Sequence, residues 1–424
     1  MYANDTLEFL TSLQRYGWKL GLKNISALLE EMGNPHLKFK SVHIAGTNGK
    51  GSTAAILESV FRQAGYKTGL YTSPHLLDVA ERIKVSGLPI PWEKLKLYLN
   101  HFGDTIQRFE CTYFETLTAL AFRHFSDSSI DVAFVEVGLG GRFDATNVLQ
   151  PELCIITEID LDHTDYLGTT TESIAKEKAG IIKTQIPCLS GSENVKVQEI
   201  LSDISQSRKA TFYDLKYLCT IHRKKVTEEF SIFDLIFSDE SYYNLKLNLA
   251  GKHQIKNSAL AIAAIRILSQ NNFNIKREDI YAGLQGACWP GRLQKLQNDP
   301  KIVLDVAHNP AAMRKLTSAL KSIYHYERLI FLIGFLKDKN YKAMVKSLSS
   351  VADYIFIVAP STDRALDGQQ LAQAMSQFSS NFQACSNMKE AIQNVLSFAT
   401  REDLICVTGS HYTVGEFLKF YKKS

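Results

Sequence analysis

Short apolar runs alternate with segments of helical spacing along most of this chain. In the first half, strand-like segments fall at residues 42–45, 67–72, 130–137 and 153–157, each bounded by glycine, proline or clustered polar residues. Apolar runs of about four to eight residues are typical of strands that are buried on both faces of a parallel sheet. The pattern therefore predicts an α/β fold with a mainly parallel sheet.

Helices are predicted where apolar residues recur with helical spacing, at residues 5–32 with a break near Gly17–Gly21, at 92–101 and 112–125, and from about Thr171. Residues 191–245 are polar and mixed, apart from an alternation at 229–237 that predicts antiparallel strands. No chemistry is expected in that segment. A strongly apolar helix is predicted at 258–268, and at least one of the preceding polar residues His253, Gln254 and Asn257 is expected to cap it.

The last third of the chain repeats the strand–helix alternation after a segment punctuated by proline and glycine. Strands are predicted at 301–305, 328–333, 353–358 and 403–408, and helices at 310–323 and 341–348. This pattern predicts a second, smaller parallel-sheet domain with right-handed crossovers. We therefore expect an N-terminal domain at residues 1–289, a linker at 290–293 and a C-terminal α/β domain at 294–424.

A glycine-rich loop follows the strand at 42–45 and contains Lys50, Gly51, Ser52 and Thr53. Such a loop lets the backbone approach an anion, and the N–H groups of the helix expected from about Thr53 would face it. Lys50 would supply charge for terminal phosphates, and a hydroxyl could reach magnesium. Gly51 is an addition to the standard P-loop pattern. The competing interpretation is a glycine-rich turn with a surface lysine.

Polar residues also follow the other strands of the first half, at the edge where open α/β sheets bind ligands. Glu136 ends a buried run, so an ionised carboxylate there must be paired or bound to a cation, unless it is a surface glutamate. His163 stands beside Asp162 and favours a role in holding magnesium or phosphate over that of an ordinary buried or surface histidine. Lys178 lies among helix charges that could equally form a solvated face.

Composition narrows the class of protein. The chain has 424 residues, 45% of them apolar and 22% charged, with 48 basic and 44 acidic residues and a net charge of +4. No dense basic block is present, so a small anionic substrate is favoured over nucleic acid. The seven scattered cysteines form no C-x-x-C pair, which indicates reduced thiols in a cytoplasmic protein. No apolar run is long enough to span a membrane.

With these features in place, the chain closely resembles the folylpolyglutamate synthase and dihydrofolate synthase family of the Mur ligase superfamily. The resemblance runs in register along nearly the whole sequence and rests on motifs at residues 17–21, 43–52, 71–75, 81–83, 112–115, 136–142, 144–147, 161–165, 177–182, 253–254, 290–292, 305–310 and 408–410. It implies a Mur-ligase-like fold, with an N-terminal P-loop ATPase-type domain and a smaller Rossmann-like C-terminal domain.

The resemblance also implies a set of nucleotide and metal residues. ATP would contact Thr47, Asn48, Gly49, Lys50, Gly51, Ser52, Asn257, Arg292 and Asp305. One or two Mg²⁺ ions would be held by Ser52, Ser73, Glu136, His163 and Lys178. Lys178 matches the superfamily lysine that is carbamylated by carbon dioxide. The residues implied to act in catalysis are Lys50, Glu136, His163, Lys178 and His308.

The implied reaction is ATP-driven ligation of L-glutamate to dihydropteroate and to folates through an acyl phosphate, without a nucleophilic serine or cysteine. The pterin-bearing substrate would contact Thr112, Phe114, Arg142, Asp144, Ala145 and Ser410. A monomer is expected, with no nucleic-acid or membrane partner. Val306 departs from the family, which more often has glycine there. The alternatives are another Mur-type ligase acting on a cell-wall nucleotide precursor and a nucleotide-binding regulator without ligase activity.

Overall fold

An eight-stranded sheet forms the centre of the N-terminal part of the chain in the computed structural model, which describes residues 3–17, 21–270 and 273–421. The order is β4-β3-β2-β5-β1-β6-β7-β8, and β2, β5, β1, β6, β7 and β8 are parallel. Its strands are β1 Lys40–Ala45, β2 Thr68–Tyr71, β3 Ile83–Val85, β4 Leu88–Pro89, β5 Val132–Glu136, β6 Leu153–Ile156, β7 Cys188–Ser190 and β8 Phe212–Asp214.

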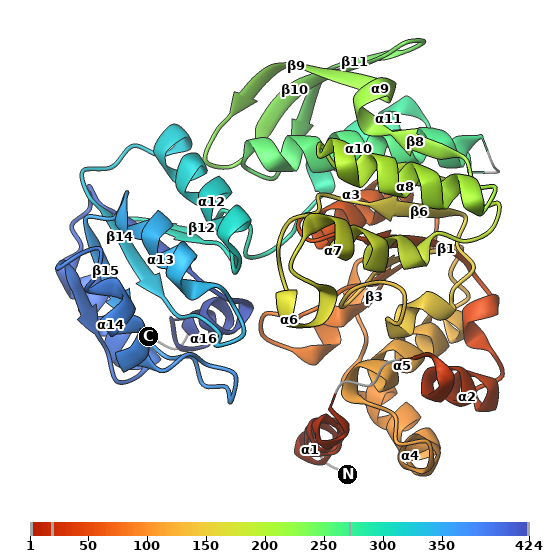
Figure 1. Cartoon of the computed structure of the whole chain (residues 1–424), viewed down its shortest axis with the longest axis horizontal. Coiled ribbons are helices and arrows are strands. Elements are labelled where there is room, and N and C mark those ends of the chain that lie inside the picture. The colour runs from red at the N-terminus through yellow and green to blue at the C-terminus, as the bar shows by residue number, and fades with distance from the viewer. Residues whose placement is uncertain (1–2, 18–20, 271–272, 422–424) are drawn as a thin grey trace.

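Helices cover both faces of this sheet (Figure 1). One face packs against α3 Lys50–Gln63, α10 Lys252–Ser269 and α11 Arg277–Gly286. On the other face, α5 Tyr113–Asp127, α7 Thr171–Lys178 and α8 Val195–Ser207 pack on the sheet. Helices α2 Lys23–Glu31 and α4 Trp92–Arg108 pack on α5, and α1 Ala3–Ser12 packs on α4. Coverage on both faces explains why β1, β5 and β6 are nearly continuous apolar runs. Two four-residue helices, α6 Thr164–Leu167 and α9 Leu215–Leu218, complete this part.

A small antiparallel sheet packs on α10 and α11, at the top of the molecule in Figure 1. Its strands are β9 Cys219–Val226, β10 Ser231–Phe237 and β11 Ser241–Leu247, with β10 in the middle. This confirms the antiparallel strands predicted from the alternation at 229–237. We call the chain up to residue 286 the large lobe.

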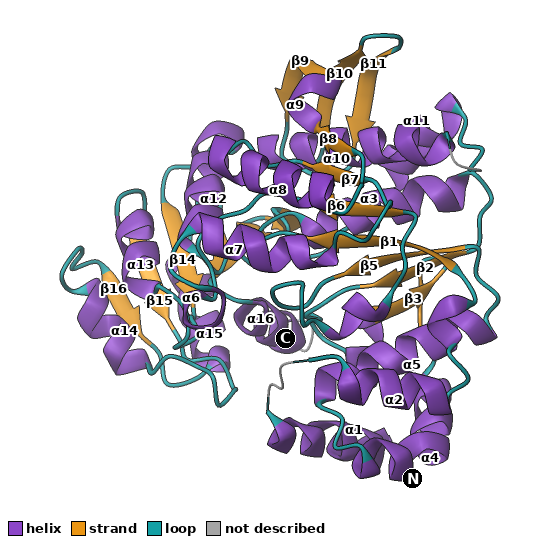
Figure 2. Ribbon diagram, turned by 45° about the vertical axis from the view of Figure 1, so that its right-hand side comes forward, coloured by secondary structure: helices purple, strands orange, loops and turns teal. Residues whose placement is uncertain are grey.

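A six-stranded sheet organises residues 294–421, which we call the small lobe and which is drawn in cyan and blue in Figure 1. The order β12-β13-β17-β14-β15-β16 combines β12 Gln294–Asn298, β13 Lys301–Leu304, β14 Leu329–Ile333, β15 Tyr354–Ile357, β16 Phe382–Ala384 and β17 Leu404–Thr408. One face packs against α12 Pro310–Ile323, α13 Tyr341–Ser349 and α14 Gly368–Met375, and the other against α15 Met388–Phe398 and α16 His411–Tyr421 (Figure 2). The predicted α/β layering of this lobe is confirmed.

Several details differ from the prediction. Helix α3 begins at Lys50 rather than near Thr53, because Gly49 makes the turn with φ of 94° and the helix follows at once. Helix α10 begins at Lys252, so the three polar residues expected to precede it lie in its first turns, and its N-cap Gly251 makes no side-chain cap bond. Helix α8 was not predicted, and β12 is antiparallel to β13.

Residues 18–20 of the predicted break at Gly17–Gly21 lie outside the described residues. No helix in the described part of the chain combines the length and the apolar character needed to cross a membrane. The cysteines are free thiols, and Cys111, Cys154, Cys188, Cys385 and Cys406 are buried.

Candidate active site

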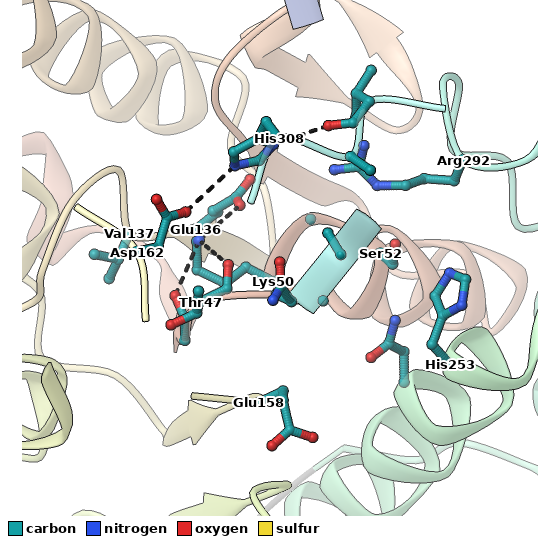
Figure 3. Close-up of a pocket in the computed structure, with 18 of the residues that line it drawn as sticks. Thr47, Lys50, Ser52, Glu136, Val137, Glu158, Asp162, His253, Arg292 and His308 are labelled. Carbon is teal, nitrogen blue, oxygen red and sulfur yellow. Dashed lines mark hydrogen bonds and ion pairs between the residues drawn. The ribbon is translucent and has the colours of Figure 1, made fainter. Parts of the chain in front are cut away.

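The loop between β1 and α3 holds Lys50 over its own backbone. Lys50 Nζ donates to the carbonyl oxygens of Gly46 and Thr47, at 3.1 and 3.2 Å, and lies 3.9 Å from Glu136 Oε1 (Figure 3). The amino end of α3 presents free N–H groups to the same space. A helix N-terminus and an ammonium group on one side of a cavity are suited to binding a polyphosphate.

The extra glycine of this loop is required by close packing. A Cβ atom at Gly51 would lie 2.7 Å from a ring carbon of Trp289 and 3.2 Å from Glu136 Oε2. A Cβ atom at Gly49 would lie 2.6 Å from Asn257 Oδ1, which places Asn257 of α10 beside the loop. Larger residues at either position would push the loop away from the groups that it approaches.

Glu136 is a buried carboxylate, and its burial carries a desolvation cost. It is 5% exposed at the end of β5, and it accepts the N–H of Ser73 at 3.1 Å. Burial raises the pKa of Glu136, although Lys50 and the Ser73 N–H act in the opposite direction. The hydroxyl-bearing residues Ser52 and Ser73 line the same cavity. These are hard oxygen donors of the kind that Mg²⁺ prefers.

Lys178, at the end of α7, is 5% exposed and lines the same cavity. Burial lowers the pKa of Lys178 to about 7, and the charge of Lys50 adds to this effect. At neutral pH a large share of this amine is therefore unprotonated, which gives it a lone pair for reaction with an electrophile. The alternative of a solvated helix face is excluded for this side chain.

The two lobes meet at a cluster of charged and polar side chains around Asp162. Asp162 accepts from Lys339 Nζ at 2.6 Å and from Asn309 Nδ2 at 3.1 Å, and lies 3.6 Å from His308 Nε2. Burial alone would raise the pKa of Asp162, but His308 and Lys339 outweigh burial and hold that pKa well below its usual range. Asp162 therefore stays ionised and joins three small-lobe residues to the large lobe.

His163 belongs to the same cluster. Its Nε2 lies 3.0 Å from Lys339 Nζ, so the ring nitrogen accepts a hydrogen bond from the ammonium group. Burial lowers the pKa of His163 to about 4, followed by the effect of Lys339, and the imidazole is neutral at pH 7. Its backbone has a φ of 51°, an uncommon conformation for a residue other than glycine and one that is enriched at functional sites.

One cavity between the lobes brings together most of the predicted residues (Figure 3). Every residue predicted for ATP, metal or catalysis lines it: Thr47, Asn48, Gly49, Lys50, Gly51, Ser52, Ser73, Glu136, His163, Lys178, Asn257, Arg292, Asp305 and His308. They come from strand ends and helix starts far apart in the sequence, as expected for a ligand site at the edge of a parallel sheet.

A second cavity of about 860 Å³ adjoins the first. The residues that line both cavities include Ser73, His163 and His308. Its lining includes the predicted substrate residues Thr112, Phe114, Asp144, Ala145 and Ser410. Arg142 lines neither cavity. Its side chain is 51% exposed, with a guanidinium nitrogen 3.5 Å from Glu177 Oε1.

The small lobe contributes the turn from Asp305 to His308. Asp305 accepts the N–H groups of Leu293 and Ala307, at 3.0 and 2.9 Å, and this fixes the turn beside Arg292. Val306, which replaces the expected glycine, is 1% exposed and has no positive φ, and its N–H donates to Gly291 at 3.0 Å. The β-branched side chain is therefore accommodated without the strain that a left-handed turn would impose.

Several residues that line these cavities were not predicted from the sequence. They are Glu158, Asp162, Lys256, Lys315, Lys339, Arg82 and His411. Asp162 and Arg82 lie inside motifs of the resemblance, so the sequence contained a signal for them. Lys339 lies in an ordinary polar turn before α13, and nothing in its local pattern marks it.

Known proteins resemble this chain over its whole length. The family model "Mur ligase middle domain" matches residues 44–265, and "Mur ligase, glutamate ligase domain" matches residues 291–411. The dihydrofolate synthase/folylpolyglutamate synthase of Bacillus subtilis is 33% identical over 426 residues, covering 99% of each chain.

Solved structures agree with this result. Mycobacterium tuberculosis folylpolyglutamate synthase complexed with ADP and AMPPCP superposes with a TM-score of 0.90 at 30% identity, covering 99% of each chain. Escherichia coli FolC in complex with DHPP and ADP superposes with a TM-score of 0.89 at 30% identity, covering 99% of this chain and 98% of that one.

Proposed function

We propose a mechanism for this chain from the premise that it belongs to the Mur ligase family and, within it, to the dihydrofolate synthase/folylpolyglutamate synthases. It is an ATP-dependent ligase that adds L-glutamate to dihydropteroate and to folates. The residues that carry out this reaction are our proposal. In it, an acceptor carboxylate attacks the γ-phosphate of ATP to give an acyl phosphate and ADP, and the amine of L-glutamate then attacks the acyl carbon and releases phosphate.

The observation that supports this assignment is the junction between the two cavities. The first is lined by the glycine-rich loop and the second by the predicted acceptor residues, and they share Ser73, His163 and His308. ATP bound on the loop would present its terminal phosphate toward this junction. An acceptor in the second cavity would reach the same point with its carboxylate, so the two reacting groups would be held close together.

The side chains at the junction would act through charge. Both the acceptor carboxylate and the γ-phosphate are anions, and Lys50 at the loop would reduce their repulsion. His308 from the small lobe would approach the transferring phosphoryl group. The contacts of Lys339 and Asn309 with Asp162 would hold the lobes closed and keep water from the acyl phosphate.

Glu136, Ser52 and Ser73 form the donor set that fits magnesium in the first cavity, because a buried carboxylate lies there beside two hydroxyl-bearing residues. Among the described residues no three histidine, cysteine, aspartate or glutamate side chains gather for a metal. His163 would have to leave Lys339 to join this donor set. Bound magnesium would neutralise charge on the transferring phosphoryl group.

Lys178 is suited to carbamylation. A neutral amine attacks carbon dioxide through its lone pair, forms an N–C bond and releases a proton, which gives an anionic carbamate. The pKa of about 7, caused first by burial, makes the neutral amine available at physiological pH. Carbon-13 bicarbonate should give a carbamate NMR signal in the protein. The signal should be absent in Lys178→Arg, and its presence there would refute the assignment.

The activity is tested by incubating the purified protein with ATP, magnesium and L-glutamate plus dihydropteroate, tetrahydrofolate or a UDP-linked cell-wall precursor in turn. Glutamate-dependent ADP release with the first two acceptors is the expected result. Activity with the UDP-linked acceptor alone would overturn the folate assignment. ATP binding without turnover would favour a nucleotide-binding regulator.

Glu136→Ala should abolish turnover while leaving the fold intact, as judged by circular dichroism and thermal unfolding. Leu37→Ala is a matched control, because Leu37 is 64% exposed and lines neither cavity. We propose that the protein acts as a monomer. Sedimentation during turnover would test this.

A further inference from the structure

A buried chain of hydrogen bonds runs from strand β1 to the second cavity. His43, 0% exposed, lies in the middle of β1, and its Nε2 is 2.7 Å from Thr146 Oγ1. Thr146 Oγ1 in turn donates to Asp144 Oδ1 at 2.5 Å. Asp144 lines the second cavity, whereas His43 and Thr146 line neither cavity. The histidine is therefore a buried titratable group that the mechanism above does not use.

The direction of the hydrogen bonds follows from the number of protons. The Thr146 hydroxyl has a single proton, and the Asp144 carboxylate can only accept, so that proton points to Asp144. Thr146 Oγ1 must then accept from His43, which places the imidazole proton on Nε2. His43 Nδ1 has no hydrogen-bond partner in the described part of the chain, and a buried lone pair without a partner costs less than a buried N–H would.

The protonation state of His43 agrees with this direction. Burial lowers the pKa of His43 to about 3, and the charge of Lys183 acts in the same sense. At neutral pH the ring is therefore an uncharged donor. Lys183 Nζ also donates to the Asn147 carbonyl at 2.7 Å and so holds the end of the same turn.

At the other end of the chain, the contacts fix the Asp144 carboxylate in one orientation. Oδ1 accepts both the N–H and the hydroxyl of Thr146, and Oδ2 accepts the N–H of Leu139 at 2.9 Å. Burial raises the pKa of Asp144, and the hydroxyl of Thr146 and the N–H groups of Leu139, Thr146 and Gly138 act in the opposite direction. A carboxylate oxygen has two lone-pair sites, so Oδ2, which accepts from Leu139, has a site left for a donor in the cavity. The amino and ring N–H groups of a pterin are donors that match it.

We infer that His43 is a positioning residue for the pterin-bearing substrate, acting through Thr146 to orient the Asp144 carboxylate. The inference rests on the proposed function, in which the second cavity receives this substrate. It extends the role of the 43–52 motif, because the strand that leads to the phosphate-binding loop also fixes a group of the acceptor site. Strand β1 would then help to position both a substrate bound at Asp144 and a nucleotide bound at the loop.

Steady-state kinetics on four variants tests the inference. His43→Leu removes the donor at similar volume, and His43→Gln keeps an N–H near the Nε2 position. Thr146→Val removes the hydroxyl, and Thr146→Ser keeps it. At saturating ATP and glutamate, KM for dihydropteroate should rise about fivefold in His43→Leu and about tenfold in Thr146→Val, whereas His43→Gln and Thr146→Ser should stay within about twofold of wild type. KM for ATP and kcat should change by less than about twofold in all four.

The double variant His43→Leu/Thr146→Val distinguishes a role of His43 in positioning the substrate from a general role in stabilising the fold. Because His43 acts through Thr146, the double variant should raise KM for dihydropteroate no further than Thr146→Val alone. Additive increases, or parallel losses in kcat and ATP affinity that follow the melting temperature, would overturn the inference. If His43→Leu does not fold, Thr146→Val and His43→Gln remain decisive, since an unchanged acceptor KM in Thr146→Val also overturns it.

Two further variants distinguish failure of the inference from failure of the proposed function. Asp144→Asn should raise KM for dihydropteroate, and no change there would remove Asp144 from the acceptor site itself. A rise in Asp144→Asn without one in His43→Leu or Thr146→Val would overturn the inference alone. His124→Gln is the matched control, because His124 is 8% exposed, lines neither cavity and should leave the acceptor KM unchanged.

Discussion

Replacing Lys339 with methionine tests whether charge at the active site holds the two lobes together. Lys339 Nζ lies 2.6 Å from Asp162 Oδ1, and the two side chains are 4% and 8% exposed. At an effective dielectric constant of about 20, unit charges at this distance attract by roughly 6 kcal/mol, and desolvation offsets part of that attraction. Lys339→Met leaves Asp162 buried without its nearest cation, and breaking one side of a buried pair typically costs about 3 to 5 kcal/mol.

If this cost falls on closure of the lobes, the ratio of closed to open molecules should drop by a factor of at least about 100. We expect kcat/KM to fall by a similar factor and small-angle X-ray scattering to show a more open molecule. Asp162→Asn removes the unpaired charge, so the double variant should recover part of the loss that Lys339→Met causes. Wild-type scattering and a rate within about threefold of wild type in Lys339→Met would refute this reasoning, as would a double variant worse than Lys339→Met.

Three further changes have defined outcomes. Gly51→Ala should raise the Kd for ATP, measured by calorimetry, at least about fivefold through overpacking, whereas Gly368→Ala, whose Cβ would meet nothing within 4 Å, should not. Glu136→Gln should lower kcat at least about 100-fold without lowering the melting temperature, because burial raises the pKa of Glu136 and the neutral amide avoids that desolvation cost. Burial would raise the pKa of Asp403, but hydrogen bonds from Arg328, the shortest 2.6 Å, and from Thr400 outweigh burial and lower it. The stabilisation from these bonds is therefore present above the pKa of Asp403 in the unfolded chain and is lost as pH falls through its pKa in the folded protein. Asp403→Asn should therefore lower the free energy of unfolding in urea by about 1 to 3 kcal/mol at pH 7, and by progressively less below about pH 4. A difference that does not change with pH would contradict the stabilising role of the ionised carboxylate.

Features with a strong local pattern could be predicted from the sequence. β14 reads Leu-Ile-Phe-Leu-Ile and is buried throughout, and α12 begins where Pro310 takes the first helical position after the Asn309 cap. The burial of Glu136 followed from its place at the end of an apolar run. In each case the residues that define the feature are neighbours in the chain, so hydrophobic periodicity or capping chemistry specifies it.

Features set by distant residues could not be predicted in this way. The start of α10 depends on the backbone at Gly251, whose φ of 110° ends the preceding segment without a side-chain cap. Lys339 is separated from Asp162 by 177 positions, and a lysine in a polar turn has no local signal of burial. Its position follows from the packing of the small lobe against the large one. The depressed pKa of Lys178 likewise needs the covering elements before it can be inferred.

In the proposed mechanism the contacts between the lobes lie at the reaction site itself, and this links closure of the lobes to the chemical step. Asn309 donates to Asn48 beside the phosphate-binding loop at 3.0 Å and to Asp162 at 3.1 Å, while Lys339 donates to Asp162 and His163. A bound nucleotide or metal ion that moves any of these side chains therefore also changes the free energy of closing the two lobes. An acyl phosphate must be shielded from water as soon as it forms, and an enzyme whose closing contacts surround the transferring phosphoryl group can meet that need without a separate lid.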